Sequence, residues 1–341
     1  MISKLSLLAC ALPLLATDLE AQVLVVSQTG GGDFFDLQVA VTAATDGDTL
    51  LIKPGTYGGA TLFDKSLTLI GEAGADPTIG RILVQELAAE RRVALVGLTL
   101  RSATPSLVSM PRLDVVDCAG TVVVQDCEID ATPLPIFDAA TSGAEIEDSD
   151  AVFLIDCAIT GGSGASFGAA NGRAAVLVQR STVHVYGGTL RGGDGFTQSG
   201  PIAGAGGAGL DLLNGSLILR DTGLAPGLGG SGAPQSGCPV GVDGLPLALN
   251  NTPLVDLPGV HRSLSVTPNP IREGQTATVR FEGAPGDAVL WVFGFQSTAA
   301  PTPFFGGPIL PAALDFALPQ GVLPASGELT LLVPVPLLGA A

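Results

Sequence analysis

The chain has 341 residues and a formal net charge of −17 at pH 7, with 47 glycines, 25 prolines and only 14% charged residues. Because nucleic acids and anionic membranes attract basic surfaces, this charge argues against both as partners and leaves a cation or a neutral glycan as the favoured class. The hydrophobic content of 46% excludes general disorder and allows a sizeable core in a turn-rich protein.

Residues 1–21 have the layout of a secretory signal peptide. Lys4 precedes an apolar run over 5–16, and the segment LEA ends just before Gln22. The run is too short to span a bilayer, and no other segment is long and apolar enough, so we expect no membrane span. We expect an exported protein, extracellular or at the cell surface, whose mature chain starts near Gln22. A lipoprotein box at Cys10 is the alternative, which the short apolar run before it disfavours.

Segment 36–44, DLQVAVTAA, is the one stretch with a convincing helical pattern. It places Leu37, Ala40, Val41 and Ala44 on one face, just before the first β-rich segment TLLIKP. An amphipathic helix at this point predicts a cap over the open end of a stack of strands, where strand edges and core side chains would otherwise be exposed.

Six later stretches align in one register, which indicates a repeat. They begin at Leu67, Val93, Val122, Val152, Val183 and Leu217. The first and third positions are aliphatic in every copy, as expected for alternate residues of a strand that is buried on one face. A period of 26 to 34 residues indicates stacked coils rather than one closed domain.

The fifth position of the repeat predicts a bend in each coil. It is occupied by Gly71, Gly97, Asp126, Asp156, Gly187 and Asp221. These residue types tolerate left-handed and turn conformations, and in five copies an aliphatic residue of opposite parity follows at the eighth position. A bend explains this column in all six coils, because glycine replaces aspartate in three of them, and a catalytic role for the three aspartates is the minor alternative.

A second strand precedes each of the last four repeats across a tight polar turn. The strands are LDVV, EIE, AVLV and LDLL, and the turns are DCAG, DSD, QRS and NGS. Turns of this kind between β-rich runs, without helical periodicity, predict short strands that pair with the coils above and below. The expected fold is a parallel β-solenoid of about six coils or more.

With Cys10 in the signal peptide, four cysteines remain in an oxidising compartment: Cys118, Cys127, Cys157 and Cys238. Cys127 and Cys157 share one inward column of successive coils, so their backbones should be about 4.8 Å apart. This distance allows a disulfide, but in-register parallel strands point both Cβ atoms the same way and fit the bond poorly. We favour free core thiols stacked in a ladder, and the pairing of the four stays open. The spacings match no zinc site.

The first coils resemble a known family. The segment GGGDFFDLQVAVTAATDGDTLLIKPGTYGGATLFDKSLTLIGEAG is similar to the start of secreted pectin-lyase-like right-handed β-helix proteins, with their capping helix and a KSLTLIGE second coil. The match covers about residues 29–75, and the later coils match by pattern only. The resemblance implies an all-β, right-handed parallel β-helix far more strongly than any chemistry. Pectin esterase motifs are not found, because Tyr57 is followed by Gly58 and Gly59 where an esterase would carry a Glu.

Glycan-active β-helices of this kind work on an outward sheet face with paired carboxylates, often assisted by Ca²⁺ or an arginine. The strand before the tight turn supplies such carboxylates, and Leu177 interrupts their column. The catalytic candidates are Asp114, Glu145, Glu147, Asp211 and Arg180, with Arg173 beside them. A solvated face on a very acidic protein is the favoured alternative. Ca²⁺ is the one cofactor that this column suggests, and no metal site is assigned.

His184 and Tyr186 are expected to point outward from one strand, beside Arg220 of the next coil. An aromatic ring with a neighbouring His and Arg suits a sugar, so these three are candidate substrate-binding residues. The same columns contain Val123 and Phe153, and so apolar a face is normally covered, which makes packing under a loop the favoured alternative. The loops expected to supply this cover are the glycine-rich segments 161–173, 192–209 and 225–244.

The β-helix is assigned to residues 22–246, where the repeat stops, and 247–260 is interpreted as a linker. Residues 261–341 change to an alternating β pattern whose PNPxxxGQ opening resembles the C-terminal β-sandwich modules of bacterial secreted proteins. Such modules have further strands after an LLVPVP segment, so we expect a shortened small β-sandwich whose apolar edge needs a partner or a surface. Trp291 is expected in its core.

These features predict an exported β-helix protein that binds an extracellular polysaccharide or cell-surface glycan, with processing of that polymer as an extension. A non-catalytic surface or adhesion scaffold is the alternative, and a polysaccharide lyase or hydrolase is the third candidate. Whether the protein is an enzyme, and which glycan it takes, stays open at this point.

Overall fold

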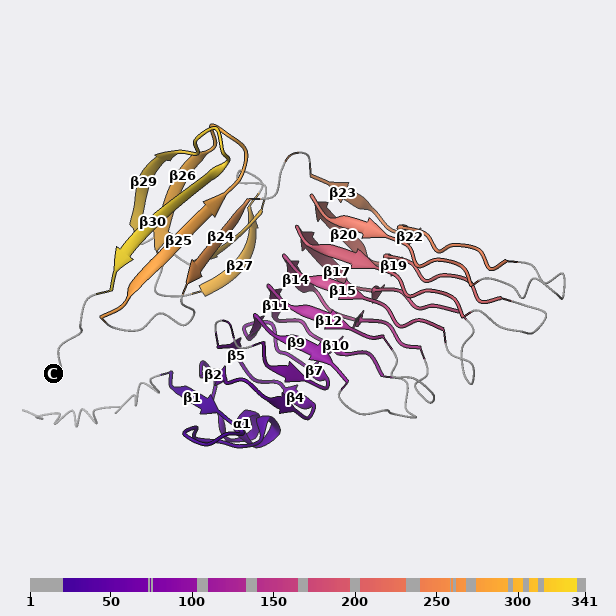
Figure 1. The fold of residues 1–341 in the computed structure, drawn as a ribbon, viewed down its shortest axis with the longest axis horizontal. Coiled ribbons are helices and arrows are strands. Elements are labelled where there is room, and N and C mark those ends of the chain that lie inside the picture. The colour runs from indigo at the N-terminus through magenta and orange to yellow at the C-terminus, as the bar shows by residue number, and fades with distance from the viewer. Residues whose placement is uncertain are drawn as a thin grey trace, which may run out of the picture.

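The computed structural model describes most of the chain after residue 20. The described residues are 21–72, 74, 76–102, 110–132, 140–164, 171–196, 203–230, 240–257, 259, 262–267, 274–293, 297–302, 307–311 and 316–335. They form an almost all-β molecule with three long parallel sheets and, towards the C-terminus, small antiparallel sheets (Figure 1). The parallel sheets are consistent with the predicted parallel β-helix. The predicted signal peptide lies outside the described residues except for Ala21.

Three parallel sheets, which we call A, B and C, run the length of the stack. Sheet A contains β1 (Val23–Val26), β2 (Thr49–Ile52), β5 (Leu67–Gly71), β8 (Arg92–Val96), β11 (Thr121–Gln125), β14 (Ala151–Ile155), β17 (Thr182–Tyr186), β20 (Ser216–Arg220) and β23 (Leu254–Asp256). Sheet B contains β3 (Thr56–Tyr57), β6 (Thr78–Ile79), β9 (Thr99–Arg101), β12 (Glu128–Asp130), β15 (Ala158–Thr160), β18 (Thr189–Arg191) and β21 (Gly223–Ala225). Sheet C contains β4 (Ala60–Phe63), β7 (Ile82–Gln85), β10 (Leu113–Val116), β13 (Ala144–Glu147), β16 (Val176–Gln179), β19 (Leu210–Leu213) and β22 (Leu247–Asn250).

The strand register of sheet A confirms the predicted repeat. The first residues of the six copies lie opposite one another along the sheet, from Leu67 through Val93 and Val122 to Leu217. Their side chains and those two residues later are buried in one continuous core. Because strands of a sheet lie about 4.8 Å apart, each aliphatic residue packs directly on the same column of the next coil.

The predicted bend is confirmed in five of the six coils. Gly97, Asp126, Asp156, Gly187 and Asp221 all have a positive φ, between 48° and 66°. Gly71 does not, and it ends strand β5. Aspartate tolerates this left-handed region because its short side chain hydrogen-bonds locally.

The predicted capping helix is confirmed as α1 (Leu37–Ala43). The Asp36 carboxylate accepts a hydrogen bond from the Val39 backbone N–H, at 2.9 Å, which satisfies one of the free donors at the helix start. Leu37, Ala40 and Val41 are buried against the first coil. The helix covers one end of the stack, as Figure 1 shows in indigo. It is the one helix among the described residues, and it is not long and apolar enough to span a membrane.

The interpretation of residues 247–260 as a linker is wrong over most of its length. Strands β22 and β23 within it pair in parallel with β19 and β20 and so add a further coil. The repeat is hard to see in the sequence of this coil because Asp256 stands at a core position, which Leu219 occupies in the coil before.

The glycine-rich loops join sheet B to sheet C and project from one corner of the stack (Figure 1). We call their described parts the glycine wing: residues 161–164, 171–175, 192–196, 203–209, 226–230 and 240–246. Successive loops are joined backbone to backbone; the Gly207 N–H donates to the Gly193 carbonyl at 2.8 Å, and the Gly227 N–H donates to the Gly207 carbonyl at 2.9 Å. A Cβ at Gly227 would lie 1.8 Å from the Gly193 carbonyl oxygen, so only glycine fits. The expectation that these loops cover sheet A is wrong, because they pack on one another.

Beyond the stack, residues 262–335 form antiparallel pairs, which we call the C-terminal region. Its largest sheet has the order β24 (Ser263–Thr267), β25 (Thr276–Glu282) and β30 (Glu328–Pro334). Two further pairs are β26 (Ala288–Phe293) with β29 (Phe316–Val322), and β27 (Ser297–Thr302) with β28 (Gly307–Pro311). Strand β27 lies against β11 of sheet A. The side chain of Trp291 lies outside the described residues.

Candidate functional site

The predicted acidic column lies on the outward face of sheet C. Asp114 of β10, Glu145 of β13, Leu177 of β16 and Asp211 of β19 occupy the same register position in successive coils. The residues on either side of them in each strand, such as Leu113 and Val115, are fully buried, which confirms the outward direction of the acids. The structure therefore brings Asp114 and Glu145 into adjacent coils, whereas Leu177 separates them from Asp211.

Arg81, which the sequence analysis did not single out, completes the ion pair at this position. Its Nη2 lies 2.7 Å from Asp114 Oδ2, and its Nη1 lies 3.3 Å from Met110 Sδ. Arg81 immediately precedes β7, one coil before Asp114. This pair could not be predicted directly from the sequence, because 33 residues separate its members and only the coil register places them together.

Glu145 is half-buried beside this ion pair. Burial raises the pKa of its carboxyl group, and the negative charges of Asp114 and Glu147 raise it further. A hydrogen bond from the Ser142 hydroxyl and the positive charge of Arg173 act in the opposite direction, and the net shift is upward. A carboxyl group in this environment keeps its proton to a higher pH than usual, and in its protonated form it can donate a hydrogen bond.

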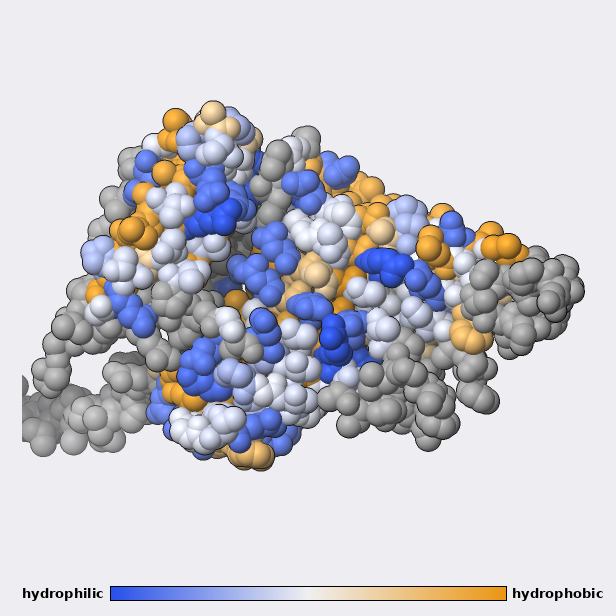
Figure 2. Space-filling view, in the orientation of Figure 1, coloured by the Kyte–Doolittle hydropathy of each residue, from blue (hydrophilic) through white to orange (hydrophobic). Residues whose placement is uncertain are grey.

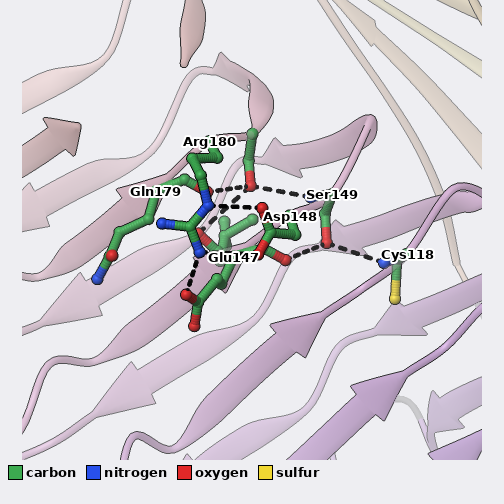
Figure 3. A network of polar contacts seen from close by, with 8 residues as sticks. Cys118, Glu147, Asp148, Ser149, Gln179 and Arg180 are labelled. Carbon is green, nitrogen blue, oxygen red and sulfur yellow. Dashed lines mark hydrogen bonds and ion pairs between the residues drawn. The ribbon is translucent and has the colours of Figure 1, made fainter. Parts of the chain in front are cut away.

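Glu147 belongs to a separate network at the turn between sheets C and A, which Figure 3 shows. The Arg180 guanidinium lies 2.7 Å from both carboxylate oxygens of Asp148 and also pairs with Glu147. Hydrogen bonds to Arg180 lower the pKa of Asp148, and those to Asp148 and Glu147 raise the pKa of Arg180. Arg180 is thus engaged by two carboxylates of the preceding coil, an arrangement that suits the joining of coils.

A ladder of buried groups continues from the same turn into the core. The backbone N–H of Cys118 donates to Ser149 Oγ at 3.3 Å, and the backbone N–H of Ser149 donates to Ser181 Oγ at 3.0 Å (Figure 3). Each residue follows the left-handed residue of its turn, as Ser149 follows Asp148. The ladder satisfies buried backbone donors from coil to coil, which is a structural role.

Asp211 lies two coils beyond Glu145. Burial raises the pKa of its carboxyl group, and its Oδ1 is buried without a hydrogen-bond partner in the described part of the chain. The register places it beside Leu177 and Ala248 rather than beside another acid. The four predicted carboxylates therefore form one close pair, one ion-paired turn and one separate acid, and not a single cluster.

The three candidate sugar-binding residues on sheet A are buried. None of the three residues, His184, Tyr186 and Arg220, is more than 8% exposed. His184 Nδ1 lies 3.3 Å from Tyr186 Oη. In this structure they cannot reach a polymer in solvent, and the alternative of a packed face is favoured instead. The outward face of sheet A forms a second apolar cluster on which Leu257 packs, and β27 of the C-terminal region lies beside it.

The three described cysteines are free and buried. Burial raises the pKa of Cys127 to about 12 and that of Cys157 upward as well. Each thiol donates to backbone carbonyls, as Cys157 Sγ does to Ile155 O at 3.3 Å. This agrees with the predicted thiol ladder; Cys238 lies outside the described residues. Where the chain is described, no three His, Cys, Asp or Glu side chains gather as metal ligands.

The aligned bend aspartates also border a polar cleft of about 470 Å³ between sheet A and the C-terminal region. Asp156 and Asp221 line one side of it, and Arg280, Glu282 and Glu328 line the other. Arg280 Nη2 lies 3.0 Å from Glu328 and 2.5 Å from Glu282, so the arginine is held by its own sheet. This cleft could not be predicted from the sequence, because its two sides come from separate parts of the fold.

The chain matches no model of a known protein family, and no curated protein matches it.

Proposed function

We propose that this chain is an exported right-handed parallel β-helix protein of the pectin-lyase-like kind, which binds extracellular polysaccharide along the outward face of sheet C. The observation that carries the proposal is the pairing of half-buried Glu145 with Asp114 in adjacent coils, next to Arg81. A carboxyl group with a raised pKa, a carboxylate and a guanidinium offer donors and acceptors side by side, as sugar hydroxyl groups require.

The same pair supports processing of the bound polymer as an extension of binding. Glycoside hydrolysis uses two carboxyl groups, one held protonated as the acid and one ionised. Burial favours the protonated form of Glu145, and Asp114, which is ion-paired with Arg81, supplies the second carboxyl group. In this proposal the C-terminal region is the shortened β-sandwich module expected from the PNPxxxGQ opening.

A glycan array, run with and without Ca²⁺, tests the proposal. We expect retention of the purified chain on at least one polysaccharide, and at least a tenfold loss of affinity in Glu145→Gln and in Asp114→Asn. The matched control is Glu128→Gln, which removes an exposed carboxylate from sheet B and should leave binding unchanged. Release of reducing ends or unsaturated products would add processing to binding. Failure of the wild-type chain to bind any glycan would overturn the proposal.

A non-catalytic surface scaffold is the second candidate. It is favoured by the engagement of Glu147 and Asp148 with Arg180 and by the interruption of the acidic column at Leu177, which leave few free polar groups on the face. A scaffold should neither bind glycans nor turn them over while remaining cell-associated, so the same array separates the two functions.

A further inference from the structure

The two ends of the stack differ. Helix α1 covers the N-terminal end, whereas strands β21, β22 and β23 are the last strands of sheets B, C and A. We call the described residues 223–230 and 240–257 the terminal coil. The last strand of a sheet presents backbone groups along its outer edge that can pair with another chain.

The terminal coil also carries exposed apolar side chains. Seven of its large hydrophobic residues are between 37% and 73% exposed: Leu228, Val240, Val242, Leu245, Leu249, Leu254 and Val255. Hydrophobic residues gather along the corresponding upper right edge of the molecule in Figure 2. Exposed apolar residues scattered singly are normal, but a contiguous group of this kind marks an interaction surface.

Two of these residues belong to columns that form the core elsewhere. Leu249 lies opposite Leu212, and Leu254 lies opposite Leu217. Leu212 and Leu217 are fully buried, because the next coil packs on them. The core columns therefore end at the terminal coil in side chains that are partly exposed to solvent.

The glycine wing ends in the same coil in a way that stops further stacking. Gly241 and Gly244 face the preceding loop so closely that a Cβ on either would lie 2.0 Å from a carbonyl oxygen. Their neighbours Val240, Val242 and Leu245 are exposed instead. A further glycine strand cannot approach past these side chains, so at the glycine wing a partner meets an apolar surface rather than a backbone ladder.

Charge indicates what the partner is. The terminal coil has two charged residues, Asp243 and Asp256, among its 26 described positions, in a chain with a net charge of −17. One of them is tied back, since Asp243 Oδ1 accepts a hydrogen bond from the Gly229 N–H at 2.7 Å. Two copies of so acidic a chain repel each other over most of their surfaces, and the terminal coil offers apolar area with few like charges.

We propose that two copies of this chain associate end to end through their terminal coils, about a two-fold axis. Such an interface uses the same patch on both copies, so it needs no second surface. Around the axis, the exposed core columns pack on those of the partner, and the outer edges of the last strands lie antiparallel to their mates. The association leaves the face of sheet C free, so it is independent of glycan binding.

Sedimentation velocity of the purified full chain over a concentration series tests the proposal. We expect a monomer–dimer equilibrium that strengthens with salt, because salt screens the repulsion of acidic chains. Val255→Glu should raise the Kd about a hundredfold or more, since it places two like charges in the interface. The matched control is Val39→Glu on helix α1, with the same change at a similarly exposed site, 56% against 49%, and it should leave the Kd unchanged.

Leu245→Glu on the wing provides a second variant, and circular dichroism checks whether each variant is folded. Small-angle X-ray scattering of the dimer distinguishes the arrangement, because end-to-end association places the two stacks in line, whereas side-by-side association places them next to each other. A wild-type chain that stays monomeric, a compact side-by-side dimer, or equal weakening by Val39→Glu and Val255→Glu would each overturn the proposal.

Discussion

Phe153 and His184 lie opposite each other in adjacent strands of sheet A, and their rings stack with centroids 4.5 Å apart and planes inclined by 22°. Both side chains are buried on the outward face of the sheet, where β27 of the C-terminal region lies against β11. Burial lowers the pKa of His184 to about 4, from an ordinary value of 6.5. The histidine is therefore a neutral packing residue at neutral pH.

The depressed pKa predicts a loss of stability in mild acid. The unfolded chain takes up a proton on this histidine as the pH falls through about 6.5, whereas the folded chain does so only near 4. The free energy of unfolding should thus be unaffected by His184 above the unfolded pKa and fall by about 3 kcal/mol between pH 6.5 and 4. Urea unfolding curves at a series of pH values measure this.

His184→Ile is the control, because Ile218 occupies the same register position in the next coil. The variant should lose less stability than the wild-type chain over that pH range, which separates the histidine from the titration of the many carboxylates. The chain has only two histidines, so NMR can follow His184 directly. A His184 pKa near 6.5 in the folded protein would contradict the assignment.

The left-handed bend at Asp126 predicts which substitutions the coil tolerates. Its φ is 51°, and in two other coils a glycine at this position, Gly97 or Gly187, also has a positive φ. Asp126→Asn and Asp126→Gly should change the free energy of unfolding by less than about 1 kcal/mol, whereas Asp126→Val should cost about 1–3 kcal/mol because β-branched residues avoid this region. Denaturant unfolding compares the three variants.

Glycan binding provides an independent readout of the same residue. Asp126→Asn removes the charge but keeps the bend, so it should bind like the wild-type chain if the aspartate serves the backbone only. A loss of binding in Asp126→Asn at unchanged stability would instead assign Asp126 to a site.

The thiol ladder predicts slow reactivity of Cys127 and Cys157. Both are buried, and burial raises the pKa of Cys127 to about 12, so little thiolate forms at neutral pH. Iodoacetamide should leave both thiols unmodified in the native chain and alkylate both in denaturant without any reductant. Peptide mass mapping checks this, and a disulfide-linked pair of the two peptides would show that the ladder is oxidised.

Column patterns predicted the parts of the fold that repeat. Every coil must place apolar side chains on the core axis and turn sharply. Its strand was therefore predictable from a column that contains Leu67 and Val93, and its bend from a column that contains Asp126 and Asp156. Helix α1 was predictable for a similar reason, since one face must be apolar. The candidate carboxylates Asp114 and Glu145 were placed correctly on the outward face because strand parity alone decides it.

The sequence was less informative where contacts replace side-chain patterns. Arg81 and Asp114 meet only through the register of the coils, and strand β11 of sheet A meets β27, which lies more than 100 residues further along the chain. Glycine-rich segments have no periodic side chains, so the sequence of the glycine wing was interpreted as loops that cover sheet A. Its order comes from close backbone packing between successive loops, which glycine permits and which no hydrophobic pattern records.

Gly227 tests this backbone packing most directly. A Cβ at this position would lie 1.8 Å from the Gly193 carbonyl oxygen, and the Gly227 N–H donates to the Gly207 carbonyl at 2.9 Å. Gly227→Ala must push neighbouring loops apart and break such hydrogen bonds, so we expect the free energy of unfolding to fall by about 2–4 kcal/mol. Hydrogen exchange of wing peptides should accelerate at the same time, because the loops open locally.

Gly58→Ala is the matched control, since nothing lies within 4 Å of a Cβ built on Gly58. Alanine restricts the unfolded chain, so this variant should be neutral or up to about 1 kcal/mol more stable. If Gly227→Ala were as well tolerated as Gly58→Ala, with unchanged exchange in the wing, the loops would not be packed backbone to backbone. If only the wing exchanged faster while global unfolding stayed the same, the wing would open independently of the coils that carry it.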